Sequence, residues 1–242
     1  MLGFCALASA VYLFNDLCNL KEDRAHPVKR LRPLAFGSVR RRTAVSMAVS
    51  LAVAGIGVLL LTTPMTLFMG LAYVCLHVVY SLGVRNVPVL ELFFLATGFA
   101  LRVLAGAFAA SISWSAPLLL TTYGLSLLLG LGKRKAETHW GTEVNQSTRP
   151  VLRHYTPGKL AALLYGTAAV TVVSYVWLAQ RHLFGVSIAL SSILVALGVA
   201  RYLWIILKLQ GGESPERLLY SDLVMTAVLI GWAGVFLHGV YG

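Results

Sequence analysis

Long apolar stretches alternate with short polar segments along this chain. A helix of about 20 residues crosses the roughly 30 Å of hydrocarbon in a bilayer, and eight stretches reach or approach that length. They cover residues 1–16, 43–63, 65–83, 88–111, 115–133, 158–179, 183–207 and 221–241. The pattern predicts an all-α integral membrane protein, a polytopic helical bundle that forms one domain over residues 1–242.

The composition supports this assignment. Hydrophobic residues make up 58% of the chain and charged residues only 12%, whereas soluble domains carry about 25% charged residues. The net charge of +11 is also typical of nucleic-acid-binding proteins, but basic residues of membrane proteins collect in cytoplasmic loops. We therefore expect membrane lipids and no nucleic acid as partners.

The distribution of basic residues predicts the orientation. Eighteen of the 20 Lys and Arg residues lie in or beside the segments of one side, mainly 17–42, 133–159 and 201–217. Arg181 falls in an opposite loop and Arg102 lies inside an apolar stretch. The positive-inside rule places the basic segments in the cytoplasm. We expect a multi-pass protein of the plasma membrane whose functional face is cytoplasmic.

Carboxylate and amide side chains cluster where the first apolar stretch ends. Asp16, Asn19 and Asp23 are spaced i, i+3 and i+7, so a continuous helix presents them on one face, with Asn15 beside them. Oxygen donors of this kind suit Mg²⁺, which bridges to substrate phosphates. The alternative is a cluster that caps backbone groups, although aspartate at a helix C-terminus opposes the helix dipole. We predict that Asn15, Asp16, Asn19 and Asp23 bind Mg²⁺.

Basic residues follow this cluster directly. Lys29, Arg30 and Arg32 suit phosphate oxygens, because Arg makes bidentate contacts and Lys acts as a point charge. Positive-inside sorting alone would also account for a basic loop. We predict that these three residues bind substrate, together with Asn15.

The two clusters carry a resemblance to a known family. The segments NDLCNLKED and DRAHPVKRLRP resemble the paired motif of the UbiA superfamily of membrane prenyltransferases. Within it, the chain is most similar to the phosphoribosyltransferases that act on decaprenyl phosphate. Further segments carry this similarity: YSLGVRNVPVLELFFLATGFALRVLAGA, LGLGKRKAE, RPVLRHYT and SPERLLYSDL.

The resemblance implies a fold and an activity. The fold would have nine helices around a cavity that faces the cytoplasm, and this chain, with only 14 residues before Asn15, would begin within the second of them. The activity would be Mg²⁺-dependent transfer of 5-phosphoribosyl from 5-phosphoribosyl-1-diphosphate to a polyprenyl phosphate, giving a lipid precursor of cell-wall arabinose. Asp16 and Asp23 would be catalytic through the metal.

The chain departs from the superfamily pattern in each of its two motifs. Asn19 stands where the family usually has an aspartate, and the missing negative charge should weaken metal binding. Lys133 and Glu137 form K-x-x-x-E where most members carry D-x-x-x-D. A basic second motif fits the phosphoribosyl branch better than a two-metal site for a prenyl diphosphate.

The segment after the fifth apolar stretch supplies the remaining candidates. We predict catalytic roles for Lys133 and Glu137, with Lys133 neutralising a phosphate and Glu137 orienting the basic groups or reaching a sugar hydroxyl. Arg134, Arg149 and Arg153 are predicted to bind substrate. Lys133 and Glu137 are four residues apart, so a surface ion pair on the helix is the alternative.

Arg102 is the remaining predicted substrate-binding residue. A charge inside an apolar stretch is costly and usually faces the interior of the bundle. Snorkelling toward the far surface is the alternative.

Three functions are thus open to this chain. The phosphoribosyl transfer described above is the first. The second is transfer of an isoprenoid from its diphosphate to an aromatic or other small acceptor. The third is a non-catalytic membrane scaffold derived from the same fold, which Asn19 and the short first stretch would allow.

Overall fold

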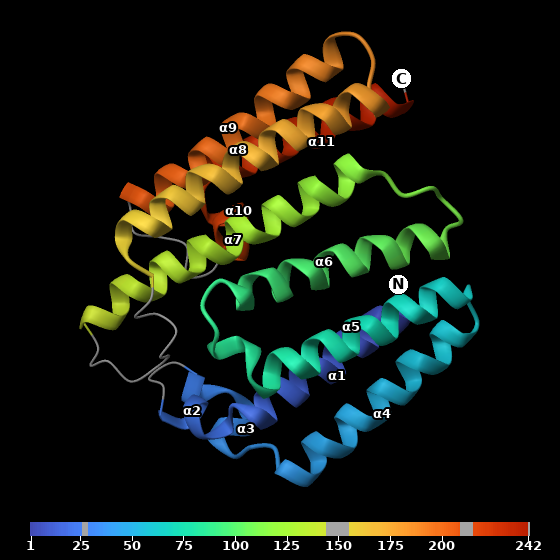
Figure 1. Ribbon diagram of the computed structural model, residues 1–242, viewed down its shortest axis with the longest axis vertical. Helices are drawn as coiled ribbons and strands as arrows, with labels where there is room; N and C mark the ends of the chain where they lie inside the picture. The colour runs from blue at the N-terminus through green and yellow to red at the C-terminus, as the bar shows by residue number, and fades with distance from the viewer. Residues whose placement is uncertain (26–28, 144–154, 209–214, 242) are drawn as a thin grey trace. The chain divides into compact units, whose positions relative to one another are not determined.

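The computed structural model describes residues 1–25, 29–143, 155–208 and 215–241 (Figure 1). Every regular element within these ranges is a helix, and each of the eight predicted apolar stretches forms one. The predicted all-α membrane fold is confirmed.

Seven of the described helices are long and apolar enough to cross a membrane. They are α4 (Arg41–Leu60), α5 (Pro64–Leu82), α6 (Leu90–Ala109), α7 (Ala116–Glu143), α8 (Pro157–His182), α9 (Val186–Lys208) and α11 (Leu223–Tyr241). The first helix, α1 (Leu2–Cys18), is apolar but shorter.

The chain forms two compact units, and the first lies within Met1–Trp114. In it α1 packs against α4 and α5, and α5 packs against α4 and α6 (Figure 1). Glycines allow α1 and α4 to touch: a Cβ atom on Gly55 would lie 2.9 Å from the carbonyl oxygen of Gly3. Such small residues are what permits close helix packing in a bilayer.

Short helices occupy the polar segment that follows α1. They are α2 (Leu20–Ala25), the 3₁₀ helix η1 (Lys29–Leu31) and α3 (Pro33–Phe36), which ends at Gly37 with a φ of +93°. Glycine takes this left-handed conformation without a steric penalty. Another 3₁₀ helix, η2 (Val84–Asn86), connects α5 to α6. The described residues that follow α1 thus form short helices, although their sequence indicated only a polar loop.

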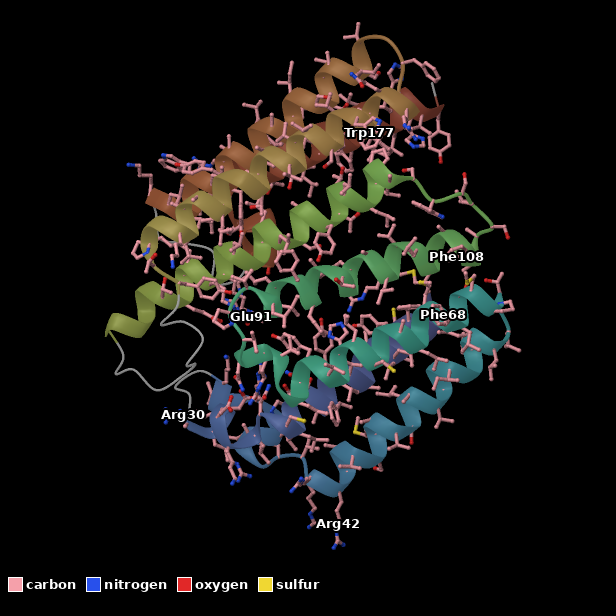
Figure 2. The ribbon with its side chains drawn as sticks, viewed as in Figure 1. Arg30, Arg42, Phe68, Glu91, Phe108 and Trp177 are labelled. Carbon is pink, nitrogen blue, oxygen red and sulfur yellow. The ribbon has the colours of Figure 1, made fainter. Side chains whose placement is uncertain are left out.

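The two ends of unit 1 differ in character. Arg30 and Arg42 lie at the end where α4 begins, whereas Phe68 and Phe108 lie at the opposite end (Figure 2). The acidic cluster at the end of α1 and the basic residues that follow it therefore lie at one end of the helices of this unit, whereas Arg102 lies within α6.

The second unit comprises the described residues 115–143, 155–208 and 215–241. Here α7 packs against α8, α8 against α9, and α9 against α11, while α10 (Pro215–Ser221) contacts α7 and α11. The core around Tyr175 and Leu183 includes Trp232, whose Nε1 donates a hydrogen bond of 2.6 Å to the Tyr175 hydroxyl. Helix α7 continues to Glu143, ten residues beyond its predicted apolar stretch.

Candidate functional site

The acidic cluster lies where α1 passes into α2. Helix α1 ends at Cys18, and Asn19, with φ −96° and ψ 5°, separates it from α2. The backbone hydrogen bonds continue across this break, because Asn19 N–H donates to the Asn15 carbonyl and Asp23 N–H donates to the Asn19 carbonyl. Asp16 and Asp23 consequently stay on one side of the chain, as their spacing predicts.

Both carboxylates contact the same arginine. The Nη1 atom of Arg32 lies 2.8 Å from Oδ1 of Asp16 and 2.9 Å from Oδ2 of Asp23. Arg32 directly precedes α3, whose first residue is Pro33, so the turn between η1 and α3 returns this side chain to the end of α1. One guanidinium group thus faces two carboxylates, which leaves a net negative charge.

The side chains of this cluster differ in exposure. The Asp23 side chain is 7% exposed, whereas those of Asp16 and Arg32 are 32% and 42% exposed. Asn19 is buried, and its Oδ1 atom has no hydrogen-bond partner. A buried acceptor without a partner costs free energy, so this oxygen is suited to a ligand that supplies a positive charge or a proton.

Three further contacts hold this end of the unit together. Ser81 of α5 donates to Oδ1 of Asn15 at 3.3 Å. The Nη2 atom of Arg85 in η2 lies 2.7 Å from Oε1 of Glu22 in α2. Arg24 Nε also donates to the carbonyl of Ala35 in α3, at 3.2 Å. These contacts fix the acidic cluster relative to α3, α5 and η2.

The oxygen donors of this cluster fit a hard divalent cation. Two carboxylates and the unpartnered Asn19 Oδ1 are the donor types that Mg²⁺ accepts. No group of three or more His, Cys, Asp or Glu side chains that could hold a metal ion occurs within the described ranges, and position 19 of this cluster carries an amide. Arg32 places a positive charge next to both carboxylates, so it would compete with a metal ion bound there.

The other basic candidates of the first unit lie on η1. Lys29 is partly buried and Arg30 is exposed, and both precede Arg32 in the same turn region. Their predicted role in substrate binding stays a prediction.

The second unit carries the other predicted site residues on α7. Lys133 is exposed, whereas Arg134 is buried and donates to the carboxylate of Glu137, three residues later. Arg149 and Arg153 lie outside the described residues. The predicted catalytic roles of Lys133 and Glu137 stay predictions.

A polar cluster around Arg102 includes residues that the sequence did not single out. Arg102 of α6 donates to the hydroxyl of Tyr73 on α5 and lies over the Tyr73 ring, 5.0 Å from its centroid. Tyr12 of α1 also interacts with this guanidinium group. Tyr12 lies four residues before Asp16, and this helical spacing is a signal from which its position could have been predicted.

The second unit has an arginine–aspartate pair of a different kind. Arg201 of α9 donates through Nε and Nη2 to the two oxygens of Asp222, at 3.3 and 2.7 Å. Asp222 precedes α11 and accepts the N–H of Met225 at 2.9 Å, as an N-cap residue does. These hydrogen bonds lower the pKa of Asp222 below its ordinary value, since they stabilise the carboxylate.

Comparison with known proteins agrees with this fold and sequence pattern. Residues 1–225 match the model of the UbiA prenyltransferase family. A decaprenyl-phosphate phosphoribosyltransferase of Corynebacterium glutamicum is 32% identical over 98% of this chain and 74% of its own length. The enzyme of the same name from Mycolicibacterium smegmatis is 30% identical, over 98% of this chain and 78% of its own.

A solved structure has a similar fold. The UbiA homologue from Archaeoglobus fulgidus bound to DMAPP and Mg²⁺ superposes with a TM-score of 0.74 at 17% identity, covering 97% of this chain and 85% of that protein. This similarity concerns the fold. The chain is a membrane transferase, and it belongs to the UbiA prenyltransferase family.

Proposed function

We propose that this protein transfers a 5-phosphoribosyl group from 5-phosphoribosyl-1-diphosphate to a polyprenyl phosphate, and that the transfer depends on Mg²⁺. The observation that carries the proposal is the convergence of Asp16 and Asp23 on Arg32, together with the unpartnered oxygen of Asn19, which lies between the two aspartates in sequence. The names of the two relatives described above support the choice of donor and acceptor. The product would be a lipid precursor of cell-wall arabinose.

Asp16, Asn19 and Asp23 would hold the metal ion, with Asn15 next to them. Bound there, Mg²⁺ supplies charge stabilisation for the departing diphosphate. Lys29, Arg30 and Arg32 would bind phosphate oxygens of the donor. Arg32 would change partners when the metal binds. A cation at the carboxylates would replace the Arg32 guanidinium group, which could then bind a phosphate.

The transfer exchanges one C–O bond for another. An oxygen of the lipid phosphate attacks the ribosyl C1, and the bond from C1 to the diphosphate breaks with the electron pair leaving on the diphosphate. A phosphate monoester already carries a negative charge of about −1.5 to −2 near neutral pH, so the attack needs no strong general base. The protein's contribution is to hold the two anions together and to stabilise the charge that develops.

The proposed setting is the cytoplasmic face of the plasma membrane. Eighteen of the 20 basic residues fall on one side of the predicted spans, which supports a cytoplasmic position for the acidic cluster. Lys133, Arg134 and Glu137 are further candidates for contacts with a phosphate or a sugar hydroxyl, and Arg134 already pairs with Glu137.

The second candidate function is prenyl transfer from a prenyl diphosphate to a small aromatic acceptor. The family match and the A. fulgidus homologue, which was solved with DMAPP and Mg²⁺, favour it. Family membership supports a transferase, so the scaffold alternative has no observation in its favour.

Two labelled mixtures separate these functions. Purified protein in lipid nanodiscs receives either labelled 5-phosphoribosyl-1-diphosphate with decaprenyl phosphate, or labelled geranyl diphosphate with 4-hydroxybenzoate, each with Mg²⁺. We expect labelled lipid from the first mixture and none when Mg²⁺ is chelated. Product from the second mixture alone would overturn the proposal in favour of prenyl transfer.

A further inference from the structure

Arg102 lies deep within a helix that is long and apolar enough to cross the membrane. It is the thirteenth residue of α6 (Leu90–Ala109), about 18 Å along the helix from Leu90. Its side chain reaches Tyr73, which lies near the middle of α5 (Pro64–Leu82), rather than toward the end of α6. This direction argues against snorkelling to the far surface.

The positive charge of Arg102 has no acidic partner within the described part of the chain. Its contacts are the Tyr73 hydroxyl, the faces of the Tyr73 and Phe99 rings at 5.0 and 5.1 Å, and Tyr12. Hydroxyls and aromatic rings lower the free-energy cost of burying the guanidinium charge, but they carry no negative charge to neutralise it. Arg201 shows the contrast, since Asp222 neutralises it.

The groups nearest to this cluster add no negative charge either. The His77 ring packs edge-on against Tyr73, with ring centroids 4.4 Å apart. Its Nε2 atom is buried without a hydrogen-bond partner and faces Gly98, where a Cβ atom would lie 2.7 Å away. Tyr12, by contrast, is 63% exposed, so a ligand can approach the guanidinium group from the side of α1.

Polar groups connect this cluster to the acidic one. On α1, Tyr12 precedes Asp16 by four residues, one helical turn or about 6 Å deeper into the apolar part of the helix. On α5, the Ser81 hydroxyl lies within hydrogen-bond distance of two oxygens, the His77 carbonyl at 2.8 Å and Asn15 Oδ1 at 3.3 Å. An anion at Arg102 would therefore lie on the membrane side of a diphosphate bound at Asp16 and Asp23.

We propose that Arg102, with the hydroxyls of Tyr73 and Tyr12, binds the phosphate of the lipid acceptor. This inference rests on the proposed function, because it assigns the acceptor of that reaction. The guanidinium group carries five N–H donors, and tyrosine hydroxyls both accept and donate, so they can turn from Arg102 to the phosphate. A phosphate on a polyprenyl chain enters from the hydrocarbon, which is the side on which this cluster lies.

Binding of a short lipid phosphate tests this inference without turnover. Farnesyl phosphate is titrated against wild-type protein and Arg102→Gln in nanodiscs, with farnesol, inorganic phosphate and farnesyl diphosphate as parallel probes. We expect R102Q to bind farnesyl phosphate on the order of tenfold to a hundredfold more weakly, since charge-assisted hydrogen bonds are lost. Farnesol should bind equally to both proteins. Arg181→Gln, an exposed arginine at the end of α8, is the matched control and should change nothing.

Several results would overturn the inference. One is R102Q affinity for farnesyl phosphate within twofold of wild type. Equally weakened binding of inorganic phosphate would indicate a site for free phosphate. Weakened binding of farnesyl diphosphate alone would indicate a site for a prenyl donor. If R102Q does not fold, Arg102→Lys carries the test: it keeps the charge but loses the forked contact, so farnesyl phosphate should bind several-fold more weakly, and unchanged affinity contradicts the inference.

The outcome is separable from that of the proposed function. Should wild-type protein bind farnesyl phosphate through Arg102 yet fail to use 5-phosphoribosyl-1-diphosphate, the assignment of the donor is wrong and the acceptor subsite stands. Should phosphoribosyl transfer occur with R102Q at an unchanged KM for decaprenyl phosphate, the subsite is wrong and the function stands.

Discussion

Each unit contains an arginine–aspartate contact, and the two contacts differ in how many guanidinium nitrogens and carboxylates take part. In unit 2, Arg201 gives two nitrogens to one carboxylate, and Asp222 also accepts the Met225 N–H. In unit 1, Arg32 gives one nitrogen to two carboxylates. The first pair is neutral and hydrogen-bonded at both oxygens, whereas the second keeps a net negative charge.

This difference indicates different roles. Asp222 joins α9 to the start of α11, and the Trp204 ring lies 4.6 Å from the Arg201 guanidinium, so this pair stabilises the fold. Asp16 and Asp23 keep capacity for another cation, and Asn19 next to them has an oxygen without a partner. A saturated ion pair is suited to structure, and an unsaturated one to a ligand.

The largest effect is expected from the two aspartates of unit 1. Asp16→Asn and Asp23→Asn each remove a charged metal ligand while keeping side-chain shape, so the initial rate should fall by about a hundredfold or more. The rate is measured with labelled 5-phosphoribosyl-1-diphosphate and decaprenyl phosphate. Circular dichroism controls for folding and should show unchanged helix content. Near-normal turnover of either variant at limiting Mg²⁺ would contradict the assignment of these ligands.

Replacing Arg32 should have two opposite effects. Arg32→Gln removes the group that competes with the metal, so Mn²⁺ binding without substrate, measured by calorimetry, should tighten several-fold. The same variant loses a phosphate contact, so the KM for the phosphoribosyl donor should rise about tenfold. Arg30→Gln is the neighbouring control: it should raise the KM without changing Mn²⁺ affinity. Weaker Mn²⁺ binding by R32Q would show that Arg32 supports the metal site instead of competing with it.

Restoring an acid at position 19 should have a smaller effect. Asn19→Asp adds a negative charge next to Asp16 and Asp23, so the Mg²⁺ concentration for half-maximal rate should fall several-fold. The maximal rate at saturating Mg²⁺ is the internal control. An unchanged Mg²⁺ requirement would place the side chain of residue 19 outside the set of metal ligands.

The smallest effect on the reaction is expected from the saturated pair. Asp222→Ala should lower the melting temperature by a few degrees and leave turnover per folded molecule unchanged. The pKa of Asp222 is lowered from 3.8 in the folded protein, so its contribution to stability is present above about pH 4 and is lost as the pH falls through the lowered pKa. Melting temperatures of wild type and D222A should therefore differ at pH 7 and converge below about pH 4. A constant difference down to pH 3 would show that the charge of Asp222 does not stabilise the fold.

Local features of the sequence were sufficient for much of the site. The i, i+3, i+7 spacing placed Asp16 and Asp23 on one side, because even the interruption at Asn19 keeps the backbone hydrogen bonds of a helix. The short helices α2, η1 and α3 were not predicted, since each is only a few residues long and such helices depend on contacts such as that of Arg24 with Ala35. The single-domain organisation of the chain stays a prediction.

What the sequence determined by itself is the helical membrane fold and its family, because apolar length, charge bias and motif spacing are properties of neighbouring residues. Only the tertiary structure decided which charges meet. Arg32 reaches Asp16 across 16 residues, Arg201 reaches Asp222 across 21, and Arg102 reaches Tyr73 across 29. The partners of these arginines lie on or beside other helices, so the different electrostatic states of the three side chains arise only when those helices pack.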